Sequence, residues 1–103
     1  MVNTMDKIER QNQRETDALI MQYVRGMQQF APLNCASIYN YLKNVAHRKR
    51  ITEIKTQDRI DYLVSAGYLK EEKEWAGGEW EYFYEITADG QDLLDGNIPP
   101  RNP

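Results

Sequence analysis

The chain has 103 residues, of which 41% are hydrophobic and 28% charged, and its net charge is -3. This size and composition are typical of one small globular domain. No apolar run approaches the roughly 20 residues that a membrane-spanning helix needs, and residues 1–17 lack the apolar stretch of a secretory signal. One cysteine excludes an internal disulfide and, with one histidine, gives too few ligands for a Cys/His zinc site. We therefore expect a cytoplasmic protein without a membrane segment, a metal or a cofactor.

Charge is divided unevenly along the chain. Residues 1–30 are neutral overall, residues 31–70 carry seven basic and three acidic residues, and residues 71–103 carry two basic and nine acidic residues. A basic middle and an acidic end indicate opposed faces, because whole-chain charge says little about a local patch. The net acidity still weakens long-range attraction to phosphates, which counts against DNA binding.

Residues 1–14 form a polar segment that we expect either to extend the following helix or to fray. From residue 15 to residue 30, apolar positions recur at helical spacing and predict a helix with one core-facing side. Gly26 weakens this helix, and Pro32 ends it. The expected core-facing residues are Leu19, Ile20, Tyr23, Val24, Met27 and Phe30.

A second helix is predicted to begin after Asn34, whose side chain suits an N-cap, and to end near Ala46 and His47. Its apolar residues are Ile38, Tyr41, Leu42 and Val45. The basic run 48–50 then connects it to a third helix, for which Ile51 is an apolar anchor and Thr52 the expected N-cap.

The third helix has two distinct sides when each residue is rotated by about 100° from the last. The side expected to face the core carries Thr56, Ile60, Leu63 and Val64. The residues expected to point away are Ile54, Lys55, Asp58, Asp61 and Tyr62. Arg59 falls on one flank of the outward side and Gln57 on the other, and Gly67 ends the helix in the left-handed conformation.

Residues 68–75 and 79–86 have strand composition, and Gly77 and Gly78 between them supply the positive φ of a tight hairpin. In the second strand, one face is expected to carry Trp80, Tyr82, Tyr84 and Ile86, and the other Glu79, Glu81, Phe83 and Glu85. Thr87 caps a short last helix that runs to Leu94 and is closed by Gly96. Residues 96–103 are expected to be a loose tail, which leaves residues 15–95 as the folded domain.

The order helix, helix, helix, hairpin, short helix predicts an α+β, mainly α fold, the winged helix-turn-helix. The resemblance is carried by SIYNYL (37–42), LVSAGYL (63–69) and YFYEITADGQDLL (82–94). The last two resemble the L-x-x-x-G-hydrophobic-hydrophobic helix exit and the Y-x-L-T-x-x-G-x-x-L wing exit of MarR- and PadR-type bacterial regulators. The resemblance covers about residues 15–95 and is specific to the fold superfamily. It implies a double-stranded DNA-binding transcriptional regulator of bacterial or phage type.

The resemblance places the outward residues of the third helix at base edges in the major groove. The matching positions are Ile54, Lys55, Gln57, Asp58 and Asp61. Lys55 can contact guanine or phosphate, Gln57 can pair with adenine, and Arg59 is expected at the edge of the groove. The two aspartates are repelled by phosphates unless they accept from cytosine amino groups. The alternative is a structural helix with a solvated face of mixed charge.

The basic run Arg48, Lys49 and Arg50, with His47 and Lys43 nearby, is the second candidate site. Because it precedes the third helix, it can meet the phosphate backbone and position the protein without reading sequence. The alternative is a solvated loop, which is the usual role of a short charge run.

The hairpin departs from the resembled pattern, which often places Arg or Lys at the wing tip. Its acidic residues are Glu71, Glu72, Glu74, Glu79, Glu81 and Glu85. Trp75 and Trp80 flank the turn and are expected to form a cross-strand pair. In the alternative reading, a basic protein partner docks on a set made of Glu72, Glu74, Trp75, Glu79 and Trp80. The chain would then be a protein–protein interaction module, such as an adaptor in a nucleoprotein complex.

No catalytic site is predicted. His47 is the one candidate base, and its basic neighbours make it a poor one. Cys35 starts a helix whose dipole can lower a thiol pKa, although such a cysteine is more often a small buried residue. The resemblance also implies a homodimer, for which the N-terminal helix is the better element because the last helix is short.

Overall fold

The computed structural model describes residues 4–99, with side chains described from Lys7 onward. The first three residues of the polar N-terminal segment and residues 100–103 of the expected tail lie outside the described residues. Along the chain the elements are α1 (Thr4–Met27), α2 (Cys35–Asn40), the π-helical turn η1 (Tyr41–Val45), α3 (Glu53–Ser65), β1 (Leu69–Ala76), β2 (Glu79–Ile86) and α4 (Ala88–Leu94). This order is the winged-helix order that the sequence predicts.

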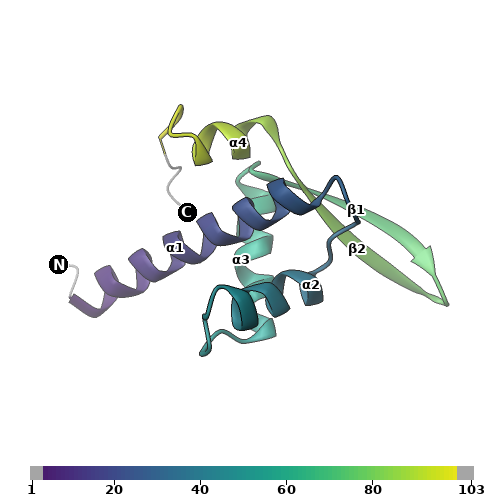
Figure 1. Ribbon diagram of the computed structural model, residues 1–103, viewed down its shortest axis with the longest axis horizontal. Helices are drawn as coiled ribbons and strands as arrows, with labels where there is room; N and C mark the ends of the chain where they lie inside the picture. Colours follow the sequence, from purple (N-terminus) through teal and green to yellow (C-terminus); the bar gives the residue numbers. More distant parts are fainter. Residues whose placement is uncertain (1–3, 100–103) are drawn as a thin grey trace.

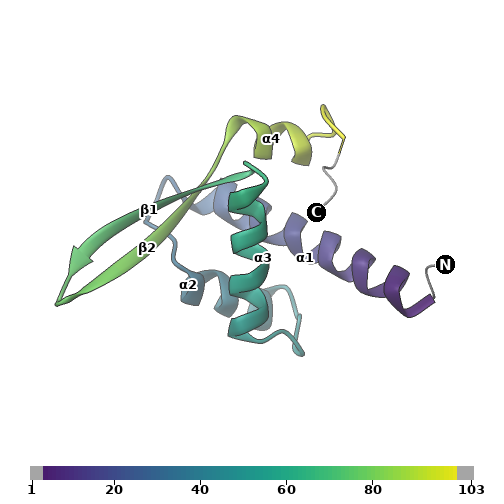
Figure 2. The same ribbon diagram turned by 180° about the vertical axis from the view of Figure 1, so that it is seen from behind.

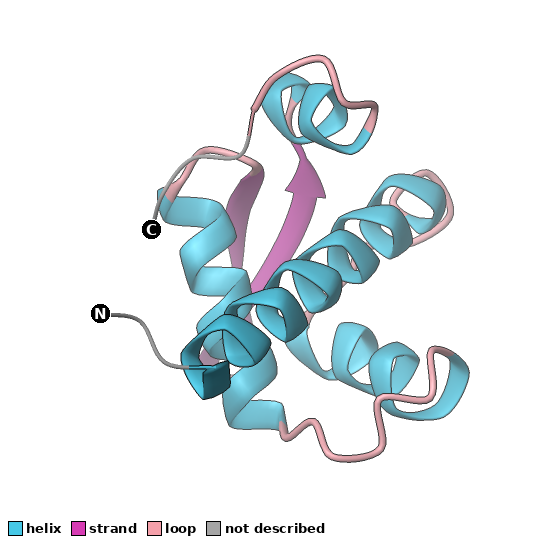
Figure 3. Ribbon diagram, turned by 90° about the vertical axis from the view of Figure 1, so that its left-hand side faces the viewer, coloured by secondary structure: helices cyan, strands magenta, loops and turns pink. Residues whose placement is uncertain are grey.

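The helices form one layer, and the hairpin of β1 and β2 projects from it as a wing (Figure 1). α1 is the long central helix, with α2 on one side of it and α4 on the other, and α3 crosses behind it. The wing extends away from the N-terminal end of α1, and the view from behind shows the same arrangement (Figure 2). Figure 3 looks from that N-terminal end, with the strands behind α1. Within residues 4–99, no helix is both long and apolar enough to cross a bilayer.

Each of three helices begins at the predicted N-cap. The side chain of Asn34 accepts the Ser37 amide at 2.8 Å, and that of Thr52 accepts the Lys55 amide at 3.1 Å. The Thr87 hydroxyl accepts the Gly90 amide at 3.0 Å. A cap of this kind stabilises its helix by about 1 kcal/mol, because it satisfies an amide that the helix itself leaves unpaired.

The core lies where α1, α2, α3 and the base of the wing meet. Its fully buried side chains are Ile20, Val24, Ile38, Leu42, Ile60, Leu63, Thr56 and Tyr68. Three residues predicted to face the core are instead exposed: Met27 by 39%, Phe30 by 73% and Val45 by 63%. For Phe30 the reason is that α1 ends at Met27, so that the helical periodicity no longer directs side chains inward beyond that residue.

Val45 is exposed because the second helix changes its winding. Its last turn is π-helical, with the Ala46 amide donating to the Tyr41 carbonyl at 2.9 Å. The wider turn rotates Val45 off the buried stripe that an α-helix would continue. His47 follows with φ of 59°, a left-handed conformation that redirects the chain toward α3.

The wing is an antiparallel hairpin in which Trp75 lies opposite Trp80. Their rings meet edge to face, with centroids 5.3 Å apart, which confirms the predicted cross-strand pair. At the base of the wing, the outer edge of β2 is anchored to the helical layer. The Tyr84 amide donates to the Leu33 carbonyl at 2.9 Å, and the Ile86 amide donates to the Gln28 side-chain oxygen at 2.8 Å.

Candidate nucleic-acid interface

The N-terminal half of α3 is open to solvent on its outward side. Ile54 is 76% exposed, and Lys55, Asp58 and Asp61 are also exposed. These are four of the five residues that the sequence predicts to point away from the core; the fifth, Tyr62, is half-buried and packs against the core. The outward side offers one cation and two carboxylates to a partner, so its charge alone does not favour nucleic acid.

A groove of about 830 Å³ adjoins this end of α3 and separates it from α1. Its basic lining comprises His47, Arg48, Lys49, Arg50, Lys55 and Arg59. The structure thus brings five of the six predicted DNA-binding residues to one groove, from two different elements. Gln57 is the sixth and does not line it. Glu9 and Asp58 also line the groove, so the lining is of mixed charge but mainly basic.

The cations of the basic run differ in how they are held. The Arg48 guanidinium donates to Glu15 on α1 at 2.9 Å, and this hydrogen bond lowers the pKa of the Glu15 carboxyl. Lys49 and Arg50 are exposed and make no ion pair within residues 7–99. Lys49 and Arg50 are therefore available to an anionic partner. Arg48 lies beside them, and its contact with α1 fixes the direction of its side chain.

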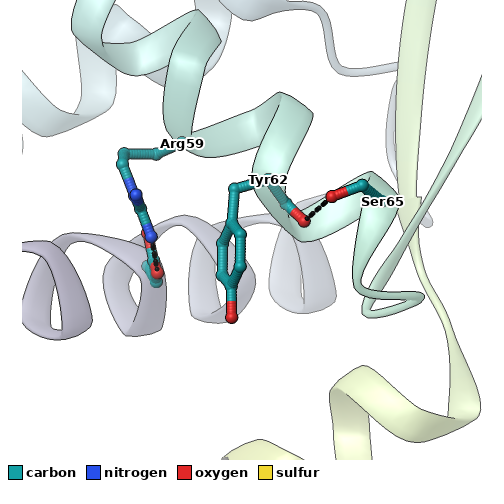
Figure 4. Close-up of polar contacts among 4 residues, drawn as sticks. Arg59, Tyr62 and Ser65 are labelled. Carbon is teal, nitrogen blue, oxygen red and sulfur yellow. Dashed lines mark hydrogen bonds and ion pairs between the residues drawn. The ribbon is translucent and has the colours of Figure 1, made fainter. Parts of the chain in front are cut away.

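Arg59 is turned away from the outward side of α3. Its guanidinium donates to both carboxylate oxygens of Asp17 on α1, from Nε at 2.9 Å and from Nη2 at 2.8 Å. Figure 4 shows the Arg59 side chain reaching toward α1, with Tyr62 beside it. The guanidinium carbon lies 4.6 Å from the centre of the Tyr62 ring. Arg59 thus joins two helices, whereas the sequence predicts it at the edge of the DNA groove.

The environment of this ion pair shifts the pKa of both of its groups. The hydrogen bond to Asp17 raises the pKa of Arg59. Burial raises the pKa of Asp17, and the hydrogen bonds and charge of Arg59 oppose that shift. The side chains are only 18% and 11% exposed, so the pair is far less accessible to solvent than an ordinary surface ion pair.

Gln57 is half-buried and connects α3 to the wing. Its amide nitrogen donates to Asp61 at 2.9 Å and to the hydroxyl of Tyr84 on β2 at 3.1 Å. Burial raises the pKa of Tyr84 to about 12, against the lowering effect of the hydrogen bond from Gln57. The residue expected to read adenine therefore has its amide engaged within the protein.

The register of the hairpin separates the residues that the sequence groups as one partner-binding set. Trp75 and Trp80 share a face with Tyr84, and this face is turned toward α3 because Tyr84 bonds to Gln57. The opposite face carries Glu72, Glu74, Glu79, Glu81 and Glu85. Most of the acidic charge of the wing therefore points away from the candidate DNA helix. On the α3 side, Lys73 lies with its ammonium 4.6 Å from the Trp80 ring centre.

Cys35 does not have the environment of a reactive thiol. Burial, followed by the charges of Glu53 and Asp61, raises its pKa to about 11, which outweighs the lowering expected from the helix start. Its sulfur lies 3.9 Å from the Glu53 carbonyl oxygen. In the part of the chain that the structure describes, no three His, Cys, Asp or Glu side chains gather where they could hold a metal ion.

Solved structures share the arrangement of helices and wing seen in this chain. The chain is similar to smu.1704 from Streptococcus mutans UA159, with a TM-score of 0.63 and 22% identity over 79% of this chain and 70% of that one. It is also similar to Bacillus subtilis PadR in complex with operator DNA, with a TM-score of 0.65 and 16% identity over 84% of this chain and 48% of PadR. No family model and no curated protein matches the sequence. The chain spans about half the length of PadR, and its fold is a winged helix-turn-helix like that of PadR.

Proposed function

We propose that the chain is a cytoplasmic transcriptional regulator that binds double-stranded DNA. The observation that carries this proposal is the groove beside the start of α3, in which the basic run and Lys55 come together. Phosphates that follow a duplex past α3 would meet these cations while the exposed end of α3 enters the major groove. The likeness to a regulator solved with its operator supports the same assignment.

The residues of the groove take different roles in this proposal. Lys49 and Arg50 contact phosphates, since neither is engaged in an ion pair within residues 7–99. Arg48 adds a third contact from a direction fixed by Glu15. Lys55 lies at the rim of the major groove. Arg59 positions α3 through Asp17 and is assigned no DNA contact.

Base reading falls to the exposed positions of α3 and to Gln57, whose amide must leave Tyr84 to reach a base edge. Asp58 and Asp61 suit cytosine amino groups, which donate to a carboxylate in the major groove. Near phosphates the same carboxylates repel, so they act against non-specific binding more than against a matching site.

The proposed regulator acts as a homodimer. A groove of about 490 Å³ between α1, α3 and α4 has an apolar floor that includes Met21, Leu63, Leu93 and Leu94. Ile8, on the N-terminal half of α1, is 53% exposed and can reach a second copy. A twofold arrangement would present two α3 helices to successive major grooves.

The test is a titration of the pure chain into labelled random-sequence duplex DNA at about 50 mM and about 200 mM salt. We expect binding at the lower salt and a large loss at the higher, because each neutralised phosphate releases counterions. The charge-reversed variant Lys49→Glu/Arg50→Glu is expected to lose binding at both. Failure of the unmodified chain to bind duplex at about 50 mM salt would rule the proposal out.

A further inference from the structure

One face of the wing combines dense negative charge with a half-buried aromatic ring. The register places five carboxylates and the ring of Phe83 on the side of the hairpin away from α3. The carboxylates are Glu72, Glu74, Glu79, Glu81 and Glu85, and all five are exposed. Lys70 is the only cation on this face, and its ammonium pairs with Glu72 at 2.9 Å. We call this side the acidic face of the wing.

The acidic face continues into a groove of about 590 Å³ against the connection between α1 and α2. Phe30, Ala31 and Pro32 line it on the helical side, and Phe83 lines it on the wing. Phe30 is 73% exposed, so its ring is open to a partner. Glu72, Glu74 and Glu85 also line this groove, as does Lys73, so three carboxylates and one cation surround its apolar residues and the net charge of the rim is negative.

Folding does not account for this arrangement. Glu74 lies directly opposite Glu81 in the hairpin, and like charges in that relation destabilise a sheet. Neither residue, nor Glu79 or Glu85, makes an ion pair within residues 7–99. A cation bound between the two strands would relieve the repulsion that the free hairpin carries.

We propose that the acidic face and its groove dock a basic segment of another protein that carries an apolar side chain. Charge complementarity selects the occupant, because lysines or arginines match the carboxylate rim while nucleic acid is repelled from it. Phe30 and Phe83 receive the apolar side chain, in the manner of an aromatic anchor site within a polar rim. This surface is separate from the basic groove at α3, so one chain can hold DNA and a protein partner together.

The probe is a fluorescein-labelled peptide of alternating lysine and leucine, about eight residues long, titrated against the full chain and followed by anisotropy. A peptide of alternating lysine and serine has the same charge without the apolar side chains. We expect the lysine–serine peptide to bind at least about tenfold more weakly. Equal binding of the two peptides, or no binding of the lysine–leucine peptide, would overturn the proposal.

Variants locate the site. We expect Phe30→Ser to weaken the lysine–leucine peptide about fivefold or more, and Glu74→Gln/Glu81→Gln to weaken it about tenfold or more. The control Glu9→Gln/Glu71→Gln removes the same charge from α1 and from the opposite face of the wing, and is expected to stay within about twofold of the unmodified chain. A control that weakens binding as much as the test variants would show charge attraction without a site, and would refute the proposal.

Sedimentation of the free chain tests whether the groove is instead occupied by a second copy of the chain. If Glu74→Gln/Glu81→Gln dissociated a dimer of the unmodified chain, the groove would belong to a second copy and the proposal would be wrong. We expect the same oligomeric state for both. The DNA affinity of this variant is expected to equal or exceed that of the unmodified chain. Peptide binding and DNA binding therefore test the two proposals separately.

Discussion

Arg59 on α3 makes a two-point contact with Asp17 on α1, at 2.9 and 2.8 Å. The planar guanidinium fixes both the distance and the direction between the two helices, as a bidentate pair does and a single hydrogen bond does not. Since the exposed end of α3 is the proposed DNA-reading element, its placement depends on an acidic residue of α1 that lies outside the proposed interface.

Breaking this pair is expected to cost much of the stability of the domain. Asp17→Asn leaves a largely buried guanidinium without its counter-charge, and we expect a loss of about 2 to 4 kcal/mol in the free energy of unfolding, measured in urea. The control is Glu15→Gln, which removes the partner of Arg48 from a pair that is 30% and 47% exposed and is expected to change the stability far less, because solvent screens an exposed pair. Similar losses in the two variants would contradict the structural role of Asp17.

The role of Arg59 in DNA binding can be separated from its role in positioning α3. If Arg59 only positions the helix, Asp17→Asn and Arg59→Met are expected to lower DNA affinity to a similar extent, because both release α3 from α1. If its guanidinium contacts phosphate, Arg59→Met lowers both the affinity and the salt slope, whereas Asp17→Asn leaves the slope intact. The measurement is the duplex titration at several salt concentrations, at a temperature where both variants are folded.

The basic run is expected to set the salt dependence of binding. Changing Arg48, Lys49 and Arg50 together to Ala should weaken binding to all duplexes and reduce the salt slope by about 2 to 3, because each phosphate contact contributes about 0.9. The control Arg25→Gln/Lys70→Gln removes cations whose partners are Asp95 and Glu72, at other surfaces. An unchanged slope in the triple variant would remove the run from the interface.

Local signals in the sequence predicted the elements well. Asn34, Thr52 and Thr87 each satisfy an amide within three residues, and such a contact does not depend on the rest of the fold. The positive φ of Gly77 and Gly78 at the wing turn is equally local. The π-helical turn at residues 41–45 was not predicted, because it depends on packing against distant parts of the chain, which a short window of sequence does not contain.

The contacts of the candidate site were not predicted, because its side chains are held by residues far along the chain. Arg59 meets Asp17 across 42 positions of sequence, and Gln57 meets Tyr84 across 27. One signal was present: Asp17 falls on the buried stripe of Ile20, Met21 and Val24 at helical spacing. A carboxylate on a buried stripe needs a cationic or hydrogen-bonding partner. The division of the wing into two faces required the strand register as well as the alternation within each strand.

Gly90 and Gly26 give opposite predictions for the same substitution. A Cβ at Gly90 would meet the carbonyl oxygen of Tyr68 and lie 2.7 Å from Ile86 Cγ1. Because backbone cannot yield as a side chain can, we expect Gly90→Ala to destabilise the domain by at least about 2 kcal/mol. Gly26, in α1, has open space around that position, so Gly26→Ala is expected to stabilise by about 0.5 to 1 kcal/mol. Urea unfolding measures both, and equal signs would contradict the packing of α4 on Tyr68.

Alkylation of Cys35 tests the electrostatics at the start of α2. Its pKa of about 11 lies two units above the ordinary value of 9.0, so at pH 8 the native chain holds about 100-fold less thiolate than an ordinary thiol. The rate with iodoacetamide should therefore rise about tenfold for each pH unit from 7 to 9.5 without levelling off, while the urea-unfolded chain levels off near pH 9. Glu53→Gln removes the larger of the two acidic influences and is expected to raise the native rate. A native profile that levelled off below pH 9 would show that the helix dipole, and not burial, governs this thiol.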